Sequence, residues 1–366
     1  MPKSQKDKET LEKLKEVGKE IYKQISSGES PAYELPVRTL NNIYFDKKSL
    51  TIKLGDKTSQ RQFLNVAHTR KFTQTMLVAS EIKKIINEEA TVSIRDLYYA
   101  LKHTIEGTQE NTFEDQSESD PIIEDIEASM NLLREELHLA ASSKGVIVGN
   151  MKIKDGKDTI DLTKMGSGGW GVPSNVEPDK IEIKDLDAEF VLFIEKDAVW
   201  KRFNEDKFWQ KNKCILITGR GQPSRAERRL VQRINKEYKL PVYALMDADP
   251  WGMYIYSVIK QGSISLSYSE EKLATPDTKY IGLTVRDVET FKIPKEVTIK
   301  LNKLDEKRLN EMKGYDWFKK KEWQEEFRLM KEKAVKLELE ALSKKGIRFI
   351  TETYLPQKIK SKDFLP

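Results

Sequence analysis

Three short apolar segments, each running directly into charged residues or glycine, constrain the fold of this chain more than any other feature. Their sequences are F-V-L-F-I-E at 190–195, C-I-L-I-T-G at 214–219 and V-Y-A-L-M-D-A-D-P-W-G at 242–252. Such runs, separated by stretches of helical character, are typical of buried strands in an α/β unit with a parallel sheet. The carboxyl ends of parallel strands meet at one edge of the sheet. We therefore expect Glu195, Asp247 and Asp249 to converge there.

The D-x-D pair at the end of the third segment predicts a metal site. Side chains alternate along an extended chain, so Asp247 and Asp249 share one side of it. Crowded carboxylates repel each other unless a cation lies between them. Mg²⁺ is the expected ion because it takes oxygen ligands and is often bound by only one or two carboxylates. Taken alone, the two aspartates could also belong to an acidic turn after a strand. Glu195, at the end of a second strand, favours a metal site.

Composition excludes several classes of protein. The 366 residues are enough for two or three domains, and 38% of them are hydrophobic. No apolar run approaches the ~20 residues of a membrane helix, and the first residues lack the apolar core of a signal peptide. Three His are too few and too scattered for a zinc site, and one cysteine permits no disulfide framework. We expect an intracellular protein, with no membrane among its partners.

Net charge says little about nucleic acid, because 64 basic and 59 acidic residues leave only +5. Charged residues make up 34% of the chain, with Lys and Glu prominent. This usage resembles that of hyperthermophile proteins. It favours an archaeal, cytoplasmic protein, associated with the nucleoid if it binds DNA.

A short helix is predicted from residue 94, after a capping pair formed by Ser93 and Asp96. At about 100° per residue, one stripe of this helix is apolar and should face a core. That stripe contains Ile94, Leu97, Tyr98 and Leu101.

The opposite side of this helix carries the second of two adjacent tyrosines. Tyr99 falls roughly 140° from the apolar stripe, with Arg95 and Lys102 on its side. Helix geometry alone favours an ordinary exposed tyrosine. The functional alternative is that Arg95 holds a phosphate while the Tyr99 hydroxyl attacks it.

The remaining segments outline the organisation of the chain. We expect an amphipathic helix over 9–25, strands within 35–54 and helices within 60–145, interrupted by an acidic loop over 106–121. A helix carrying Ile123 to Leu137 then precedes a hairpin that turns at Asp155-Gly156. Helices followed by such a hairpin suggest a winged helix. Glycine-rich residues 165–173 read as a linker, and the chain has no phosphate-binding G-x-x-x-x-G-K-[ST] motif for ATP.

Two motifs carry a resemblance to a known family. A glutamate ending one strand and a D-x-D ending a later one resemble the Toprim domain of topoisomerases and primases. D-x-D-P-x-G, together with R-D-L-Y-Y at 95–99, is similar to the A subunit of topoisomerase VI and its relative, the meiotic double-strand-break protein. The resemblance implies that Tyr99 is the nucleophile and Arg95 the active-site arginine.

The chain departs from this family at one loop. The family usually has G-K-G-x-P-D, whereas residues 219–224 read G-R-G-Q-P-S. Arginine keeps the charge and changes the geometry, so we expect Arg220, with Lys102, to contact DNA phosphates. A helix over 225–238 follows, opened by the capping pair Ser224 and Glu227, and its arginine face is either solvated or bound to phosphate.

The resemblance implies a multidomain fold of α/β and α+β type. Residues 1–59 form an N-terminal arm of a helix and strands, and 60–164 a catabolite-activator-like winged-helix domain that carries the catalytic tyrosine. Residues 165–181 form a linker. Residues 182–366 form a Toprim domain with a central parallel sheet and a C-terminal helical extension. The R-F-I-T-E-T-Y-L-P-Q-K segment at 348–358 resembles the family's C-terminal strand.

The implied activity is that of the DNA-cleaving A subunit of an ATP-dependent type IIB topoisomerase. It breaks double-stranded DNA through a 5′-phosphotyrosyl link, with one or two Mg²⁺ per site held by Glu195, Asp247 and Asp249. A homodimer would pair with an ATPase B subunit, which binds the ATP, in an A2B2 heterotetramer. The alternatives are a winged-helix DNA-binding protein with a structural Mg²⁺, and a Toprim nuclease or primase-like enzyme without a covalent intermediate.

Overall fold

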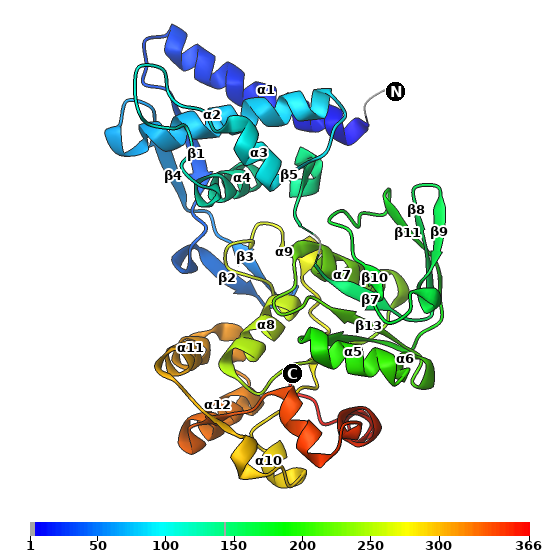
Figure 1. Ribbon diagram of the computed structural model, residues 1–366. Helices are drawn as coiled ribbons and strands as arrows, with labels where there is room; N and C mark the ends of the chain where they lie inside the picture. The colour runs from blue at the N-terminus through cyan, green and yellow to red at the C-terminus, as the bar shows by residue number, and fades with distance from the viewer. Residues whose placement is uncertain (1–3, 143) are drawn as a thin grey trace. The chain divides into compact units, whose positions relative to one another are not determined.

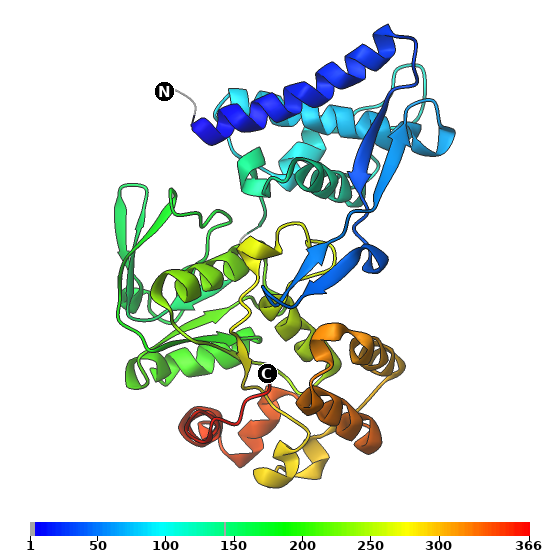
Figure 2. The same ribbon diagram turned by 180° about the vertical axis from the view of Figure 1, so that it is seen from behind.

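The computed structural model describes residues 4–142 and 144–366, which form two compact units (Figures 1 and 2). Unit 1 contains the residues up to Tyr44, Lys53–Ser142 and Ile264–Ser269. Unit 2 contains Phe45–Ile52, residues 144–263 and Glu270–Pro366. Within the described ranges, no helix is long and apolar enough to cross a membrane.

Unit 1 is mainly helical. Its elements are α1 (Gln5–Ser26), β1 (Ala32–Pro36), β4 (Thr58–Gln62), α2 (Val66–Asn87), β5 (Val92–Ser93), α3 (Ile94–Leu101), α4 (Gln116–Met130) and β6 (Leu139–Ala140). Strands β1 and β4 are antiparallel, and β5 and β6 are parallel. Helices α2, α3 and α4 share one core, in which Val78, Ile82, Leu97 and Ile123 are buried. The ribbon of β2 (Ile43–Asp46) and β3 (Thr51–Leu54) contributes residues to both units.

Two predicted boundaries in unit 1 were wrong. The acidic loop ends at Asp115 rather than at residue 121, because the Asp115 side chain accepts a hydrogen bond from Ser117 N and caps α4. The helix predicted to reach Leu137 ends at Met130. Asn131 follows it in the left-handed conformation, at φ 49°, and Arg134–Leu137 forms a separate 3₁₀ turn.

A six-stranded sheet forms the centre of unit 2, in the order β10-β7-β13-β12-β14-β15. Strand β12 (Phe190–Ile194) is parallel to β13 (Cys214–Thr218) and to β14 (Val242–Leu245), and β14 is parallel to β15 (Lys279–Tyr280). Strands β7 (Val146–Val148) and β10 (Trp170–Gly171) extend it in the antiparallel sense. The three apolar segments of the sequence are thus neighbours in space.

Helices follow the parallel strands of this sheet. They are α5 (Asp197–Glu205), α6 (Phe208–Lys211), α7 (Arg225–Tyr238), α8 (Pro250–Lys260) and α9 (Glu270–Leu273). The core includes Leu192, Trp200, Phe203, Leu216 and Leu245, all fully buried. Cys214, buried in β13 as expected, belongs to the same core.

The hairpin at Asp155-Gly156 forms as predicted, but in unit 2. Strands β8 (Met151–Asp155) and β9 (Asp158–Asp161) are antiparallel, and Gly156 turns the chain at φ 58°. Strand β8 also pairs with β11 (Ile181–Leu186), which makes a separate three-stranded sheet. The prediction that this hairpin belongs with the helices of 60–164 was wrong, because its partner strand lies downstream.

The C-terminal part of unit 2 is helical. It contains α10 (Asp287–Thr290), β16 (Ile299–Lys300), α11 (Lys303–Gly314), α12 (Lys321–Lys333), β17 (Val335–Lys336), a 3₁₀ helix (Leu339–Lys345), a π-helix (Ile350–Tyr354) and α13 (Leu355–Ser361). The strand expected at 348–358 is therefore wrong. Ile350, Tyr354 and Leu355 recur at helical spacing and are buried, and the Tyr354 hydroxyl hydrogen-bonds Gly282 O at 3.0 Å.

Three of the arginines of α7 hold the fold together. Arg228 is buried in an ion pair with Glu270, and Arg229 pairs with Glu177 at 2.6 Å. Arg233 is also buried and donates to the carbonyl oxygens of Val176 and Ile181. These three side chains are held by contacts within unit 2. Arg228 and Arg233 are buried and so are not presented to solvent or to a phosphate, and Arg229 is partly exposed.

Glu326 on α12 generates a prediction about pH. It is fully buried, and burial raises its pKa from 4.5 to about 7. A folded-state pKa above the unfolded value means that the stabilisation is complete below pH 4.5 and is lost as pH rises through about 7. Glu326→Gln should remove this loss and stabilise the protein at pH 8 by about 1–3 kcal/mol.

Urea unfolding at pH 5 and pH 8 measures this effect. Glu325→Gln is the matched control, because Glu325 is the exposed neighbour on the same helix and should change the unfolding free energy by less than about 0.5 kcal/mol. An unchanged difference between the two pH values in the Glu326 variant would contradict the prediction.

Candidate active site

Two strand ends bring Glu195 and Asp247 together. Glu195 N donates to Leu245 O at 3.1 Å, and Asp247 N donates to Glu195 Oε2 at 3.1 Å. Both side chains are buried, with exposed fractions of 8% and 3%. Asp249 follows as the N-cap of α8, where its Oδ1 accepts from Gly252 N at 2.6 Å. The three predicted carboxylates therefore lie at the carboxyl edge of the sheet.

The electrostatics of this edge are those of crowded, buried negative charge. Burial, followed by the charge of Asp247, raises the pKa of Glu195. Burial also raises the pKa of Asp247 and of Asp249. Each carboxyl group is therefore easier to protonate than it would be in water, and positive charge placed between them would relieve the repulsion.

Lys196 already supplies one positive charge. Its Nζ lies 3.0 Å from Asp247 Oδ2, 3.0 Å from Glu338 Oε2 and 2.8 Å from Glu340 Oε2. The other Asp247 oxygen, Oδ1, accepts from Leu339 N at 2.7 Å. Sequence reasoning missed Glu338 and Glu340 because they lie far downstream of the D-x-D motif, and the only local signal was Lys196 directly after Glu195.

The donor set suits a hard divalent cation, since it consists of carboxylate oxygens. Among the described residues, no three His, Cys, Asp or Glu side chains are already arranged as a metal-binding group. The contacts give the reason: Asp247 is turned toward Lys196 and Leu339, and Asp249 toward Gly252. A cation at this edge requires these side chains to exchange such contacts for metal bonds.

Arg220 lies at the same edge. It follows β13 at φ 53°, and the neighbouring Gly221 N donates to Glu195 O at 2.8 Å. The Arg220 Nε donates to Asp197 Oδ1 at 3.0 Å, and the side chain remains 44% exposed. It is placed where a phosphate near Glu195 could reach it, but it must share its guanidinium with Asp197.

The helix with the two tyrosines forms as predicted. Ser93 caps α3, with reciprocal hydrogen bonds to Asp96. Tyr98 is buried, and its hydroxyl donates to Glu114 O at 2.9 Å. Lys102 Nζ donates to the Tyr98 hydroxyl at 2.9 Å and to Glu114 O at 2.8 Å, and the first of these bonds raises the pKa of Lys102.

Tyr99 faces the other way. The residue is 60% exposed, and its ring packs against that of Tyr98 with the ring centroids 5.0 Å apart. Arg95 is exposed one turn earlier, and within the described ranges it makes no ion pair. Tyr99 and Arg95 are therefore available to a ligand, whereas the Lys102 ammonium is held by the buried tyrosine and a backbone carbonyl.

Comparison with known proteins decides the family. The Toprim-domain model of the topoisomerase 6 A subunits and Spo11 matches residues 190–359, and a type IIB DNA topoisomerase model matches 70–139. The chain is 46% identical to the A subunit of type 2 DNA topoisomerase 6 from Pyrococcus abyssi, over 97% of this chain and 95% of that protein. It belongs to the family of topoisomerase VI A subunits.

Other members of the topoisomerase VI family are also similar over most of this chain. The A subunit from Hyperthermus butylicus is 45% identical over 98% of this chain and 96% of its own length. The A subunit of DNA topoisomerase 6 from Arabidopsis thaliana is 35% identical over 94% of this chain and 79% of its own length. The family match at 70–139 contains Arg95 and Tyr99, and the Toprim match contains the three carboxylates.

A third family match clarifies the hairpin. Residues 144–187 match the all-beta domain of the topoisomerase VI alpha subunit. This range covers β7 to β11, including the hairpin that pairs with β11. The match at 190–359 confirms the Toprim assignment, and the hairpin at Asp155-Gly156 lies in a separate all-beta segment.

Gly252 in the D-x-D-P-x-G motif generates a prediction. A Cβ at this position would lie 2.8 Å from Asp247 O and 3.0 Å from Glu195 Oε2. Gly252→Ala should therefore force the carboxylates and the start of α8 apart and lower the unfolding free energy by about 1–3 kcal/mol. Thermal unfolding measures the effect.

Gly314→Ala is the matched control for this substitution. Gly314 ends α11, and a Cβ there meets nothing within 4 Å. Alanine should leave the stability unchanged or raise it by up to about 1 kcal/mol. Equal stability of the two variants would show that position 252 tolerates a side chain.

Proposed function

We propose that the chain is the DNA-cleaving subunit of a type IIB DNA topoisomerase, with Tyr99 as its nucleophile. One observation carries the assignment of the residue. Of two adjacent tyrosines, Tyr98 uses its hydroxyl to hold the fold, whereas the Tyr99 hydroxyl has no hydrogen-bond partner among the described residues and faces outward. The names of the relatives, which are DNA topoisomerase subunits, support the reaction class.

The proposed chemistry is a transesterification. The Tyr99 oxygen attacks a backbone phosphorus, a tyrosyl–phosphate bond forms at the 5′ end, and the 3′ oxygen leaves with a proton as a free hydroxyl. Arg95, four residues earlier on the same helical face, would hold the phosphate through two parallel hydrogen bonds. The covalent bond preserves the energy of the phosphodiester, so the 3′ hydroxyl can reverse the step and reseal the strand.

The carboxylate edge would hold one or two Mg²⁺, which supply positive charge to the phosphate and orient it. Glu195, Asp247 and Asp249 are the proposed ligands. Their raised pKa values support this assignment, because crowded carboxylates favour a divalent cation over three separate negative charges. Arg220 is proposed as a phosphate contact at this edge, and Lys102 would first have to release Tyr98.

The proposed assembly follows from the chemistry. Two strands must be cut, so a symmetric homodimer supplies two tyrosines, each acting with the carboxylates of the other protomer. An ATPase B subunit would complete an A2B2 heterotetramer, because this sequence has no phosphate-binding motif for ATP. The helices of unit 1 would act as the winged-helix-like DNA-binding part, supported by the common core of α2, α3 and α4.

The nucleophile is tested by Tyr99→Phe. With supercoiled DNA, Mg²⁺, ATP and the B subunit present, protein covalently attached to DNA should fall below detection, because phenylalanine has no attacking oxygen. Tyr98→Phe should retain the adduct and lose about 1 kcal/mol of stability from its missing hydrogen bonds. Gel analysis of protein-linked DNA, followed by mapping of the modified residue, measures both.

The matched tyrosine pair also separates the other possibilities. A nuclease or primase-like enzyme without a covalent intermediate would cut DNA equally well with Phe at position 99. A DNA-binding protein with a structural Mg²⁺ would cut nothing in any variant. An undiminished amount of protein–DNA adduct in the Tyr99→Phe variant would contradict the assignment of Tyr99 as the nucleophile.

The metal assignment is tested without DNA. Isothermal titration of the full chain with Mg²⁺ should show binding that Glu195→Gln or Asp247→Asn weakens at least about tenfold, since each change removes a charged ligand. Glu205→Gln, a change at an exposed carboxylate that pairs with Arg202 on the same helix, should leave the titration unchanged. Equal binding by all variants would place the cation elsewhere.

A further inference from the structure

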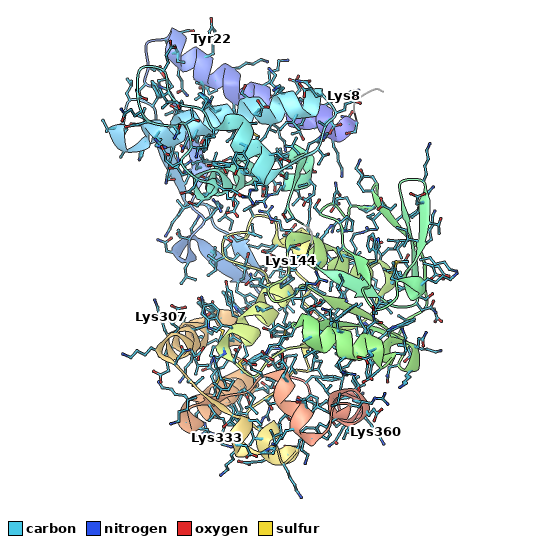
Figure 3. The ribbon with its side chains drawn as sticks, viewed as in Figure 1. Lys8, Tyr22, Lys144, Lys307, Lys333 and Lys360 are labelled. Carbon is cyan, nitrogen blue, oxygen red and sulfur yellow. The ribbon has the colours of Figure 1, made fainter. Side chains whose placement is uncertain are left out.

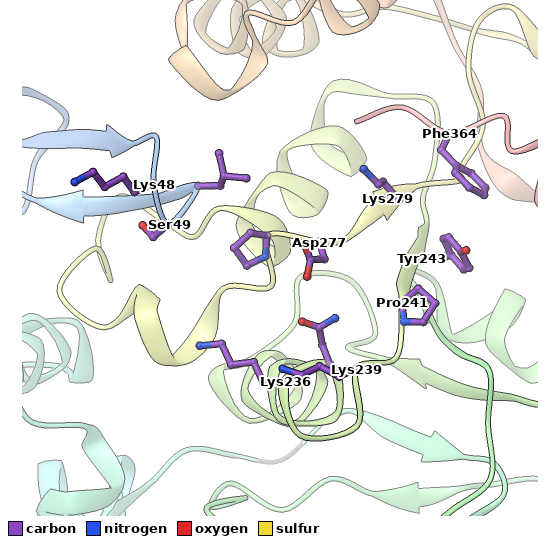
Figure 4. A pocket seen from close by; sticks show the side chains of 12 residues that line it. Lys48, Ser49, Lys236, Lys239, Pro241, Tyr243, Asp277, Lys279 and Phe364 are labelled. Atoms are coloured by element: carbon purple, nitrogen blue, oxygen red, sulfur yellow. The ribbon is translucent and has the colours of Figure 1, made fainter.

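A cavity lies at the edge of the six-stranded sheet opposite to the carboxylates. It has a volume of about 680 Å³, and all the residues that line it belong to unit 2 (Figure 4). Pro241, directly before β14, and Lys279, the first residue of β15, line it. These positions mark the amino-terminal edge of the parallel strands, whereas the candidate carboxylates follow the carboxyl ends. The volume is within the range of small-molecule sites.

Four lysines from three elements line this cavity. They are Lys48 from the turn after β2, Lys236 and Lys239 from the end of α7, and Lys279 from β15. Lys236 Nζ donates to Glu271 O at 3.2 Å. The ammonium groups of Lys48, Lys239 and Lys279 form no ion pair within 4–142 and 144–366. This positive charge is therefore not neutralised by the fold.

The charge balance of the cavity favours an anion. Four ammonium groups and one carboxylate, Asp277, leave a net charge of +3 in the lining. The C-terminal end of α7 contributes only about half a negative elementary charge. Lysine is a flexible point charge that suits phosphate without imposing a fixed geometry.

An aromatic wall closes one side of the cavity. Tyr243 and Phe364 lie with ring centroids 5.0 Å apart and planes 34° apart, and both are half-buried (Figure 4). A phosphate alone does not need such a wall. Stacking of a nucleic-acid base on an aromatic side chain is worth about 1–3 kcal/mol, so the wall matches a ligand with both a phosphate and a flat ring.

The turn that carries Lys48 is held in place. The Asp46 carboxylate accepts from Lys48 N and from Ser49 Oγ, each at 2.9 Å. Leu50 N donates to Asp46 O at 2.7 Å, and Leu50, which lines the cavity, adopts φ 56°. A leucine in this conformation costs about 1 kcal/mol, which the hydrogen bonds of the turn offset. Lys48 therefore approaches the cavity from an ordered loop.

We propose that this cavity binds a nucleotide unit, with its phosphates on the lysines and its base against Tyr243 and Phe364. Asp277 then accepts a hydrogen bond from a sugar hydroxyl when the unit is a free nucleotide. The unit is either a free nucleotide or one residue of a nucleic-acid strand, since both present a phosphate and a base. The inference uses only this edge of the sheet and holds whether or not Tyr99 cleaves DNA.

The test is fluorescence anisotropy of a labelled ATP with the full chain, in the absence of any B subunit. Lys239→Gln combined with Lys279→Gln should weaken binding at least about tenfold. The control combines Lys307→Gln with Lys360→Gln, which removes the same charge from two exposed lysines of unit 2 (Figure 3). That pair should leave the affinity unchanged.

Phe364→Leu tests the aromatic wall. It should weaken competition by unlabelled AMP and leave competition by pyrophosphate unchanged, because only AMP carries a ring. Stronger competition by hexathymidylate than by AMP identifies a strand as the source, and the reverse identifies a free nucleotide. Equal weakening in both lysine pairs, or no saturable binding up to about 1 mM labelled ATP, overturns the proposal.

Discussion

The structure of unit 2 depends on how it compensates the buried negative charges of its carboxylates. Removing a carboxylate from water costs several kcal/mol unless other groups compensate. Glu195 and Asp247 are compensated by the Lys196 ammonium and by the backbone N–H groups of Leu339 and Asp247. Asp249 is compensated at the N-terminus of α8, where the helix dipole favours an anion.

The C-terminal part of the chain contributes to this charge compensation. Ala248 and Leu337 exchange backbone hydrogen bonds of 2.9 and 3.0 Å, which align the segment after β17 beside the D-x-D motif. That alignment brings Glu338 and Glu340 to Lys196. One ammonium then faces three carboxylates, with Glu195 close by, so the edge keeps an excess of negative charge. A divalent cation would neutralise the negative charge that Lys196 alone leaves uncompensated.

Sequence alone predicted the parts that depend on local chemistry. The three apolar strands, the caps at Ser93 and Ser224, and the opposite exposures of Tyr98 and Tyr99 all follow from residue spacing. These features are set within a few residues of one another, where periodicity and capping dominate.

The features that sequence did not predict depend on distant partners. Arg228 and Arg229 are held in place because Glu270 and Glu177 reach them from other segments. Lys102 lies on the expected side of its helix but turns back to Tyr98 and Glu114. The hairpin at Gly156 joins unit 2 because β11 offers it a strand to pair with. The partners of the α7 arginines and of the hairpin lie outside any short window of sequence, and helical periodicity does not fix where the flexible Lys102 side chain turns.

The two edges of the sheet carry opposite charge, and part of this follows from topology. Helices after parallel strands start at the carboxyl edge and end at the amino edge, so their dipoles favour acids at the first and bases at the second. Asp197, Glu227 and Asp249 lie at helix starts, and Arg202, Lys236 and Lys260 at helix ends. The helix dipoles explain the sign of the charge at each edge of the sheet. They do not explain why carboxylates are buried against one another at one edge, or why lysines surround an aromatic-walled cavity at the other, and it is these two features that point to ligands.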